Sequence, residues 1–331
     1  MEIMKPVLVS GIQPSGRLHI GNYLGALKNF VDLQNSGKYE CYFFIADLHA
    51  LTENPEPKEL KENILNLTAD FLSAGLVDKK STIFQQSQIS AHSELAWIFE
   101  TIAPPGDMYR MTQYKDKSEN QHEKTNLGLL AYPALMAADI LLYDPKFVPV
   151  GHDQLQHLEL ARTLARKFNR RFGKTFIEPQ PILTKTSRAM SLDDHTKKMS
   201  KSRPQGCLFI DDSPEEIKKK IGRAVTDSGN EIKYDTEKKP AISNLLGIYS
   251  AISGKEVPAC EKHFAGKTYA EFKKELTDLV SDYFADFRKK KKELLAGPVK
   301  LKKIINEGSE KARNVAEKKI REVKEKIGVV I

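Results

Sequence analysis

The chain has 331 residues, a length that suits two domains. Its 40% hydrophobic residues are typical of a globular protein, and its formal net charge is +8. No apolar run approaches the roughly 20 residues of a transmembrane helix, and the first residues resemble neither a signal nor a transit peptide, so we expect a cytoplasmic protein without a membrane segment. The cysteines Cys41, Cys207 and Cys260 lie far apart, which argues against a disulfide framework and predicts no structural metal.

Short apolar segments alternate with amphipathic segments through the first half of the chain. The short segments predict strands, and the longer ones carry apolar residues at helical spacing. The expected strands are 5–11, 40–50, 81–87 and 146–151, and the expected helices are 20–36, 57–75, 92–102, 127–143 and 152–170. This alternation predicts an α/β fold with helices on both faces of a parallel sheet. Ligands of such sheets bind beyond the carboxyl ends of the strands.

The sequence changes character near residue 190, where turn-forming residues precede a charged and largely helical region. Ser213, Pro214 and Glu216 form a capping-box pattern that predicts a helix start. We therefore expect a smaller all-helical C-terminal domain. Residues 280–331 hold 15 Lys and Arg against 8 Asp and Glu, a composition that suits contact with nucleic acid and equally suits a solvated helix face.

The stretch VLVSGIQPSGRLHIGNYLGAL, residues 7–27, places a turn with His19, Gly21 and Asn22 between a strand and a helix. The first N–H groups of a helix have no partner within it, and together with the helix dipole they attract anions such as phosphate. The turn matches neither G-x-G-x-x-G nor the Gly-Lys-Ser/Thr of a P-loop. Taken alone, it is equally consistent with an ordinary connection that carries a surface histidine.

A second segment, KMSKS at 198–202, lies in the region of turn formers near residue 190. Its two lysines and two serines suit a loop that closes over a polyphosphate, because ammonium groups offset the charge of a leaving pyrophosphate. A solvated linker is the alternative interpretation of such a pentapeptide.

Together the two segments resemble the paired signatures of class I aminoacyl-tRNA synthetases. Within that family the chain is most similar to tryptophanyl-tRNA synthetases of bacterial type, because Asn22 stands where many members have a second histidine. Five further segments carry the same resemblance: RMTQYKDKS at 110–118, YPALMAADILLY at 132–143, VPVGHDQLQH at 148–157, AVTDS at 224–228 and KPAISNLLGIYS at 239–250. The chain departs from the family pattern at His152, where an acidic residue is usual, and at Arg203, where Asp is frequent.

The resemblance implies a domain organisation. A Rossmann-like, nucleotide-binding catalytic domain would occupy 1–190, with a candidate dimer interface at 85–145 and a homodimer as the assembly. The KMSKS loop and linker would follow at 191–209. A helical anticodon-binding domain would occupy 210–297, and a C-terminal helix at 298–331 would pack back on the catalytic domain.

The activity implied is the ATP-dependent activation of L-tryptophan and its transfer to the 3′ end of tRNA(Trp). The attacking carboxylate is already ionised, so the reaction needs positioning and charge stabilisation rather than a general base, with Mg²⁺ accompanying ATP. The implied catalytic residues are Lys198, Lys201, Lys117 and Gln13. The implied ATP contacts are Gln13, Pro14, Ser15, His19, Gly21, Asn22, Lys117, Ser118, Gly151, Asp153, Gln154, Lys198, Met199, Ser200, Lys201 and Ser202.

Selection of the amino acid depends on Asp139, the single charge in the apolar helix around YPALMAADILLY. A buried carboxylate needs a partner, and an indole offers one N–H donor and no acceptor, so the resemblance implies that Asp139 accepts the indole N–H. A structural ion pair with Lys or Arg is the alternative. With Tyr132, Met136 and Tyr143 at helical spacing on the same face, the resemblance implies an amino-acid pocket made of Asp139, Tyr132, Met136, Gln113, His49, Val9, Val148 and Val150.

Three other functions remain open at this point. A tyrosyl-tRNA synthetase shares both signatures and would need a pocket for a phenol. A nucleotidylyltransferase has a related histidine turn but does not need a long basic helical half. A non-catalytic RNA-binding protein derived from a synthetase is the third alternative.

Several residues receive structural interpretations. Asn22 and Asp153 are each also candidates for helix caps. Four other histidines, namely His92, His122, His157 and His263, are expected on surfaces or at helix caps. Trp97 is expected in the core or in an interface.

Overall fold

The computed structural model describes residues 5–112, 114–115, 126–183, 189–201, 203–229 and 231–330. These residues form two compact units, and neither unit is a continuous stretch of chain. The first unit draws on 1–15, 29–184 and 297–331, and the second on 16–28 and 185–296. Within the described part of the chain, no helix is both long enough and apolar enough to cross a membrane.

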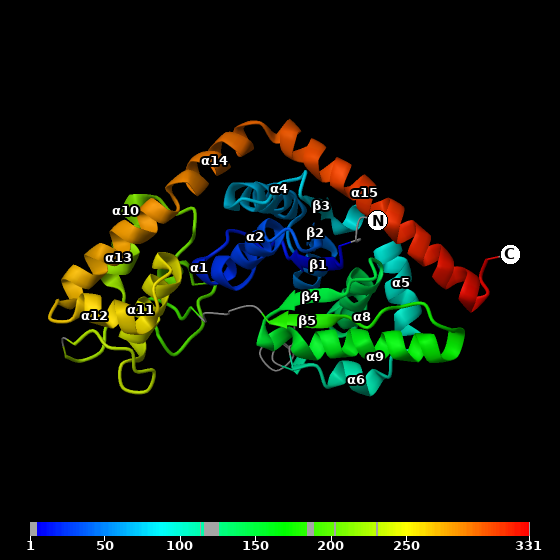
Figure 1. The fold of residues 1–331 in the computed structure, drawn as a ribbon, viewed down its shortest axis with the longest axis horizontal. Helices are drawn as coiled ribbons and strands as arrows, with labels where there is room; N and C mark the ends of the chain where they lie inside the picture. The colour runs from blue at the N-terminus through cyan, green and yellow to red at the C-terminus, as the bar shows by residue number, and fades with distance from the viewer. Residues whose placement is uncertain are drawn as a thin grey trace. The chain divides into compact units, whose positions relative to one another are not determined.

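The first unit is built on a five-stranded parallel sheet (Figure 1). Its strands are β1 (Val7–Ile12), β2 (Glu40–Ile45), β3 (Ser81–Gln85), β4 (Phe147–Val150) and β5 (Gln180–Leu183). They are ordered β3-β2-β1-β4-β5, and every pair is parallel, so the α/β fold predicted from the sequence is confirmed. The sequence did not predict β5, a four-residue edge strand that contains Pro181.

Helices of the first unit cover both faces of this sheet. They are α2 (Lys28–Asn35), α3 (Asp47–Ala50), α4 (Pro57–Ala74), α5 (Ala91–Glu100), α6 (Pro105–Tyr109), α8 (Leu127–Leu141), α9 (Leu155–Phe172) and α15 (Pro298–Ile327), with 3₁₀ turns η2 (Leu51–Glu53), η3 (Gln86–Gln88) and η5 (His152–Gln154). The helices predicted from the sequence at 57–75, 92–102, 127–143 and 152–170 are confirmed with small shifts of their ends, and α6 was not predicted. The prediction of a strand over 40–50 was wrong after Ile45, since α3 begins at Asp47.

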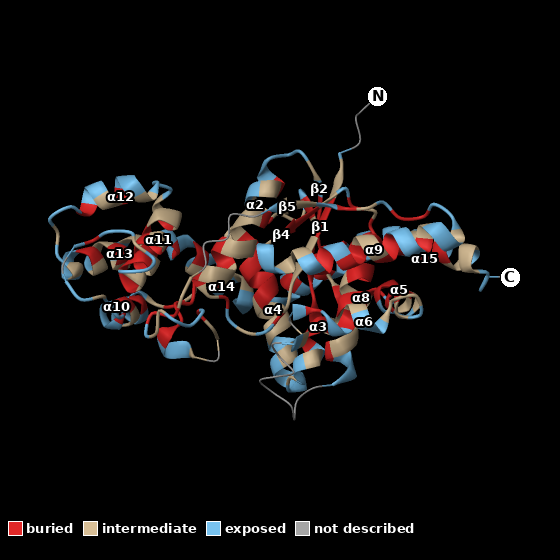
Figure 2. Cartoon of the chain, turned by 90° about the horizontal axis from the view of Figure 1, so that it is seen from below, coloured by how far each residue is buried: buried red, intermediate tan, exposed pale blue. Residues whose placement is uncertain are grey.

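Alternating residues of β2 explain why this segment reads as a continuous apolar run. Phe43 stacks on Phe30 of α2 at 4.5 Å between ring centroids, whereas Phe44 lies in the core cluster that includes α5 and α8. Both faces of the strand are therefore buried, as is usual for a central strand of a parallel sheet. Figure 2 shows the resulting contrast with α9 and α15, which each have a buried and an exposed face.

Helix α15 packs against β3, the strand at one edge of the sheet (Figure 1). The Ser309 Oγ accepts a hydrogen bond from the backbone N–H of Gln85 at 3.2 Å, so the helix supplies an acceptor to the edge of the sheet. A Cβ atom added to Gly308 would lie only 1.8 Å from the carbonyl oxygen of Ile83. Helix and strand approach this closely because residue 308 has no side chain.

The second unit is largely helical. It contains α1 (Ile20–Asn22), the π-helical turn η1 (Tyr23–Leu27), the 3₁₀ turn η6 (Pro204–Gly206), α10 (Pro214–Arg223), α11 (Pro240–Ser253), α12 (Val257–Phe264), α13 (Tyr269–Tyr283) and α14 (Ala285–Ala296). The predicted helix at 20–36 is thus divided into α1, η1 and α2. The predicted capping box is confirmed: Ser213 Oγ accepts from the Glu216 N–H at 3.2 Å, and Glu216 Oε2 accepts from the Ser213 N–H at 2.8 Å.

Candidate active site

The turn that contains His19 and Asn22 belongs to the second unit and begins α1. His19 is the N-cap, and its Nδ1 accepts a hydrogen bond from the Asn22 N–H at 3.3 Å, while Asn22 Oδ1 accepts from the His19 N–H at 3.2 Å. The capping role considered for Asn22 is therefore shared by both side chains. The backbone N–H of Ile20 donates to the Leu208 carbonyl at 2.9 Å, which ties the turn to the chain after the KMSKS loop.

The KMSKS loop lies in the same unit and reaches this turn. The Lys201 Nζ donates to the Gly16 carbonyl at 3.2 Å. A Cβ atom on Gly21 would lie 3.0 Å from the His19 ring and 3.4 Å from Cβ of Ala189, just before the loop. The second unit thus brings the two signature segments together, and a small residue at 21 keeps them close.

The loop is folded back on the residues that precede it. Lys198 forms an antiparallel β-bridge with Met190, and the Met199 N–H donates to the Ala189 carbonyl at 3.1 Å. Met199 is buried, whereas Ser200 is partly exposed. The Ser200 carbonyl accepts a hydrogen bond from the backbone N–H of Arg203. The lysines are therefore carried by a formed loop and not by an extended linker.

The structure places both departures from the family pattern. Arg203 lies with its guanidinium 3.7 Å from Asp194 Oδ2, so it pairs with an acid of the same segment. His152 is exposed at the start of η5. The N-cap of η5 is Gly151, which has no side chain, so the interpretation of Asp153 as a helix cap was wrong.

His19 is neutral at physiological pH. Burial disfavours its charged form, the nearby Lys201 ammonium adds to this effect, and together they lower the pKa of His19 to about 4. Because Nδ1 accepts from the Asn22 N–H, the ring proton resides on Nε2. The turn therefore presents a neutral N–H donor beside an ammonium group, a combination that can bind phosphate oxygens.

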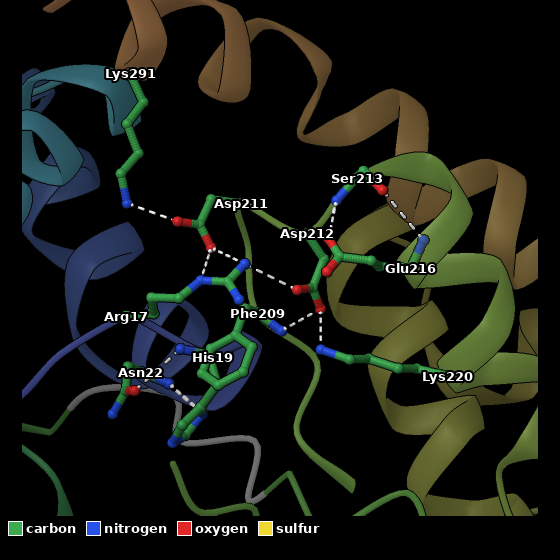
Figure 3. A network of polar contacts seen from close by, with 10 residues as sticks. All are labelled: Arg17, His19, Asn22, Phe209, Asp211, Asp212, Ser213, Glu216, Lys220 and Lys291. Atoms are coloured by element: carbon green, nitrogen blue, oxygen red, sulfur yellow. Dashed lines mark hydrogen bonds and ion pairs between the residues drawn. The ribbon is translucent and has the colours of Figure 1, made fainter. Parts of the chain in front are cut away.

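A network of charged side chains anchors this turn within the second unit (Figure 3). Arg17 donates from Nε to Asp211 Oδ1 at 2.8 Å and from Nη2 to Asp212 Oδ1 at 2.9 Å. Lys291 of α14 binds the other oxygen of Asp211 at 2.8 Å, and Lys220 of α10 binds Asp212 at 2.6 Å. Burial raises the pKa of Asp211, but Arg17 and Lys291 outweigh burial and lower it.

Phe209 lies between two of these cations. The guanidinium carbon of Arg17 is 4.3 Å from the centre of its ring, and the Lys220 Nζ is 4.6 Å from it (Figure 3). Its backbone forms a β-bridge with His19. Sequence reasoning missed this network because Asp211 and Asp212 precede a helix and look like ordinary N-terminal acids.

Other predicted residues lie in the first unit at the carboxyl ends of its strands. Gln13, Pro14 and Ser15 follow β1, and His49 follows β2 on the short helix α3. Gly151, Asp153 and Gln154 follow β4, with Asp153 exposed. Gln113, Lys117, Ser118 and Ser202 lie outside the described residues, as does His122.

Asp139 of α8 is a buried carboxylate of the first unit that several side chains bind. It is 1% exposed, and three donors bind it: His49 Nε2 to Oδ2 at 2.7 Å, His92 Nδ1 to Oδ1 at 2.6 Å and Gln86 Nε2 to Oδ1 at 2.7 Å. Burial by itself would raise the pKa of Asp139, but His49 and His92 outweigh burial and lower it to about 2. Among the described residues Asp139 pairs with histidines and with no Lys or Arg, so the predicted alternative of a structural ion pair with Lys or Arg was wrong.

Two histidines expected on the surface or at helix caps are instead buried beside α8. His92 is fully buried and also contacts the Tyr143 hydroxyl through Nε2 at 2.9 Å. His157 is 2% exposed and contacts the Tyr132 hydroxyl at 2.5 Å. Burial lowers the pKa of His157 to about 4. Both surface interpretations were wrong because a lone histidine in an amphipathic segment carries no signal of its distant partners.

The predicted apolar walls of the amino-acid pocket lie around α8. Val9, Val148 and Val150 are buried in the sheet and belong to the same core cluster as Ala137 and Ala138 of α8. Tyr132 and Met136 are half-buried on α8. Tyr143 lies just beyond the end of α8, yet its hydroxyl joins the Asp139 network through His92.

Comparison with known proteins identifies the family. The family model for class I tRNA synthetases (W and Y) matches residues 4–285. A protein of Caldanaerobacter subterraneus subsp. tengcongensis, named tryptophan–tRNA ligase, is 49% identical over 325 residues, which cover 97% of this chain and 98% of that protein.

Two solved structures are similar over nearly the whole chain. The tryptophanyl-tRNA synthetase of Mycoplasma pneumoniae has a TM-score of 0.89 at 35% identity and covers 98% of each chain. That of Campylobacter jejuni, solved with ADP and tryptophan, has a TM-score of 0.82 at 38% identity and covers 97% of this chain and 99% of its own. The chain therefore belongs to the class I tRNA synthetases of the tryptophan and tyrosine family.

Proposed function

We propose that this chain is a tryptophan–tRNA ligase, which activates L-tryptophan with ATP and transfers it to tRNA(Trp), releasing AMP and pyrophosphate. The observation that carries this proposal is the 49% identity to a protein named tryptophan–tRNA ligase over 97% of this chain. The cytoplasm, where tRNA is aminoacylated for protein synthesis, is the proposed location.

In the first step a carboxylate oxygen of tryptophan attacks the α-phosphorus of ATP. The bond from that phosphorus to the bridging oxygen breaks, and pyrophosphate leaves with the bonding electrons. No proton has to be removed, so the protein contributes by positioning the reactants and stabilising charge. Mg²⁺ is proposed as the companion of ATP; among the described residues no cluster of three His, Cys, Asp or Glu could hold a metal by itself.

We assign the phosphates to the signature turn and the KMSKS loop. The Nε2–H of neutral His19 and the ammonium of Lys201 are positioned together in the second unit, and they suit a phosphate oxygen and a developing negative charge. The proposed ATP contacts and catalytic groups are those implied by the resemblance: Gln13, Pro14, Ser15, His19, Gly21, Asn22, Lys117, Ser118, Gly151, Asp153, Gln154, Lys198, Met199, Ser200, Lys201 and Ser202.

We assign the choice of tryptophan to Asp139. An ionised carboxylate that is nearly fully buried can accept an indole N–H and would be left with an unpaired acceptor by an amino acid without that donor. The remaining proposed pocket residues are Tyr132, Met136, Gln113, His49, Val9, Val148 and Val150.

In the second step a ribose hydroxyl oxygen of the tRNA 3′ end attacks the activated carbonyl carbon. The bond from that carbon to the phosphate oxygen breaks, and AMP leaves with the bonding electrons while the hydroxyl proton passes to its phosphate. The tRNA backbone is polyanionic, so we expect binding to weaken as salt increases. We also propose a homodimer that associates through residues 85–145. Three large apolar side chains of this region are exposed, namely Trp97 at 68%, Tyr109 at 52% and Leu127 at 77%.

The proposed function is tested by ATP–pyrophosphate exchange with each of the twenty amino acids. We expect exchange with tryptophan alone and a loss of about 10²-fold in kcat/KM for Asp139→Asn, because the new amide N–H groups face the donors that now bind the carboxylate. Exchange with tyrosine would instead support the tyrosyl alternative. No exchange from folded protein that binds ATP would refute the synthetase proposal.

Two lysines of the same loop provide a matched pair of variants for the ATP site. We expect Lys201→Ala to lower kcat/KM for ATP by roughly 10²-fold, since it removes an ammonium that stabilises charge on the phosphates. Lys197→Ala removes the same charge from a side chain that is 60% exposed and pairs with Asp194, so we expect it to change kcat/KM by less than about threefold. Equal effects of the two variants would contradict the assignment of Lys201.

A further inference from the structure

His92 is fully buried, lies on α5, and has both ring nitrogens engaged. Its Nδ1 lies 2.6 Å from Asp139 Oδ1, and its Nε2 lies 2.9 Å from the hydroxyl of Tyr143. The proposed reaction makes no direct use of this side chain. A buried histidine with two specific polar partners nonetheless fixes the proton positions of both of them.

The hydrogen-bonding partners determine the tautomer of His92. Asp139 is ionised and can only accept, so His92 Nδ1 carries a proton. Burial and the charge of Asp139 raise the pKa of Tyr143 well above its usual value, so its hydroxyl keeps its proton and can donate to Nε2. A neutral ring with its proton on Nδ1 leaves no donor unused in this triad. With a doubly protonated ring, the Tyr143 proton would need another acceptor, and among the described residues none contacts it.

Gln86, the second hydrogen-bond donor to Asp139 Oδ1, is also held in one orientation. Gln86 is fully buried, and its Oε1 accepts from the backbone N–H of Leu48 at 3.0 Å. This contact orients the amide so that Nε2 donates to Oδ1 of Asp139 at 2.7 Å. His92 and Gln86 therefore use both acceptor positions of Oδ1.

The other carboxylate oxygen is less occupied. Among the described residues, Asp139 Oδ2 accepts only from His49 Nε2, at 2.7 Å. A carboxylate oxygen has two lone pairs, so Oδ2 keeps one acceptor position. The carboxylate cannot rotate to exchange its two oxygens without breaking the bonds from His92 and Gln86.

We propose that His92 is a positioning residue for tryptophan selection: acting through Asp139, it occupies Oδ1 and so presents the remaining acceptor of Oδ2 to the indole N–H. The inference rests on the proposed function and extends it to a residue that does not contact the substrate. Tyr143 donates to His92 Nε2 and so keeps the His92 proton on Nδ1. His49 binds Oδ2, the oxygen that this proposal assigns to the indole, whereas His92 binds Oδ1.

Two substitutions separate the ring nitrogens of His92. His92→Asn retains an N–H donor near the position of Nδ1 and loses the contact at Nε2. His92→Gln extends its amide toward the position of Nε2 and loses the donor to Asp139. His92→Ala removes both, and Tyr143→Phe leaves the ring but removes the donor that fixes its tautomer. Thermal unfolding identifies variants that remain folded.

The readout is discrimination between tryptophan and its benzothienyl analogue, in which sulfur replaces the indole N–H. We measure kcat/KM for both amino acids, and KM for ATP, by pyrophosphate exchange. We expect His92→Gln and His92→Ala to reduce the tryptophan-to-analogue ratio of kcat/KM by about 10-fold to 100-fold, since a hydrogen bond to a charged group is at stake. We expect His92→Asn to stay within about threefold of wild type, Tyr143→Phe to fall between these limits, and KM for ATP to be unchanged.

A merely structural role would lower the rates with both amino acids together and leave their ratio intact. Unchanged discrimination in folded His92→Gln would therefore overturn the inference, and so would an equal loss in His92→Asn and His92→Gln. If His92→Ala does not fold, the Asn and Gln variants still decide. Failure of the wild-type protein to activate tryptophan would be a distinct result that refutes the proposed function and this inference with it.

Discussion

Replacing Gly308 by Ala tests whether the close packing of α15 on β3 stabilises the first unit. The added Cβ would lie 1.8 Å from the carbonyl oxygen of Ile83, whereas real Cβ contacts do not fall below 3.0 Å. The obstacle is backbone and cannot rotate away. The helix or the strand must therefore move by at least about 1.2 Å at this point.

The cost follows from what this movement breaks. The bond from the Gln85 N–H to Ser309 Oγ, at 3.2 Å, would stretch beyond hydrogen-bonding distance, as would that from Gln88 Nε2 to Asn306 Oδ1, at 3.1 Å. Overpacking costs about 1–3 kcal/mol and each lost bond about 1 kcal/mol, while alanine returns about 1 kcal/mol of helix propensity. We expect the free energy of unfolding of the first unit to fall by about 3 kcal/mol.

Urea unfolding of the full chain measures this change, with two variants as controls. Gly247→Ala lies inside α11, where no atom is within 4 Å of the new Cβ, so we expect a gain of up to about 1 kcal/mol in the second unit. Ser309→Ala removes only the bond to Gln85 and should cost about 1 kcal/mol. A Gly308→Ala protein as stable as the wild type would refute the reasoning, because it would show that α15 can move away from β3 without loss.

Three further predictions concern other parts of the chain. Ser213→Ala should lower the thermal stability of the second unit by about 1 kcal/mol and Ser213→Asp should retain it, because only the aspartate can cap α10; equal losses would contradict the cap. Arg17→Ala releases the His19 turn from Asp211 and Asp212. It should therefore raise KM for ATP about 10-fold in pyrophosphate exchange and leave KM for tryptophan unchanged. An unchanged KM for ATP would argue against an anchoring role of Arg17. The pKa of His157 is about 4 in the folded chain and 6.5 ordinarily, so the unfolded chain binds more protons between these two pH values. Stability is therefore lost as pH falls from 6.5 to about 4. His157→Gln should flatten this part of the profile of stability against pH, and an identical profile would refute the assignment.

Much of the fold was predictable because its signals are local. The apolar run of β2, the capping box of α10 and the helical spacing of α4 each depend on residues close in sequence. The missed features depend on distant residues. The edge strand β5 is too short to show a pattern, and the π-helical turn η1 has no distinct periodicity.

The same distinction applies to the candidate site. Asp139 was singled out because a charge within an apolar helix is visible in the sequence. Of its partners, His49 was named only through the family resemblance, and Gln86 and His92 were not placed beside it. His49, Gln86 and His92 lie 90, 53 and 47 residues away along the chain, so no local pattern links them to Asp139. Tertiary contacts, and not local pattern, bring them to one carboxylate.

The closure of the sheet edge by α15 has a consequence for biosynthesis. Strand β3 is made early, and the helix that supplies Ser309 to its edge is made only after the whole of residues 185–296. Until then an unpaired strand edge is available to other chains. A nascent or truncated chain without α15 would therefore expose the edge of β3 to association with other chains, and synthesis of α15 protects this edge.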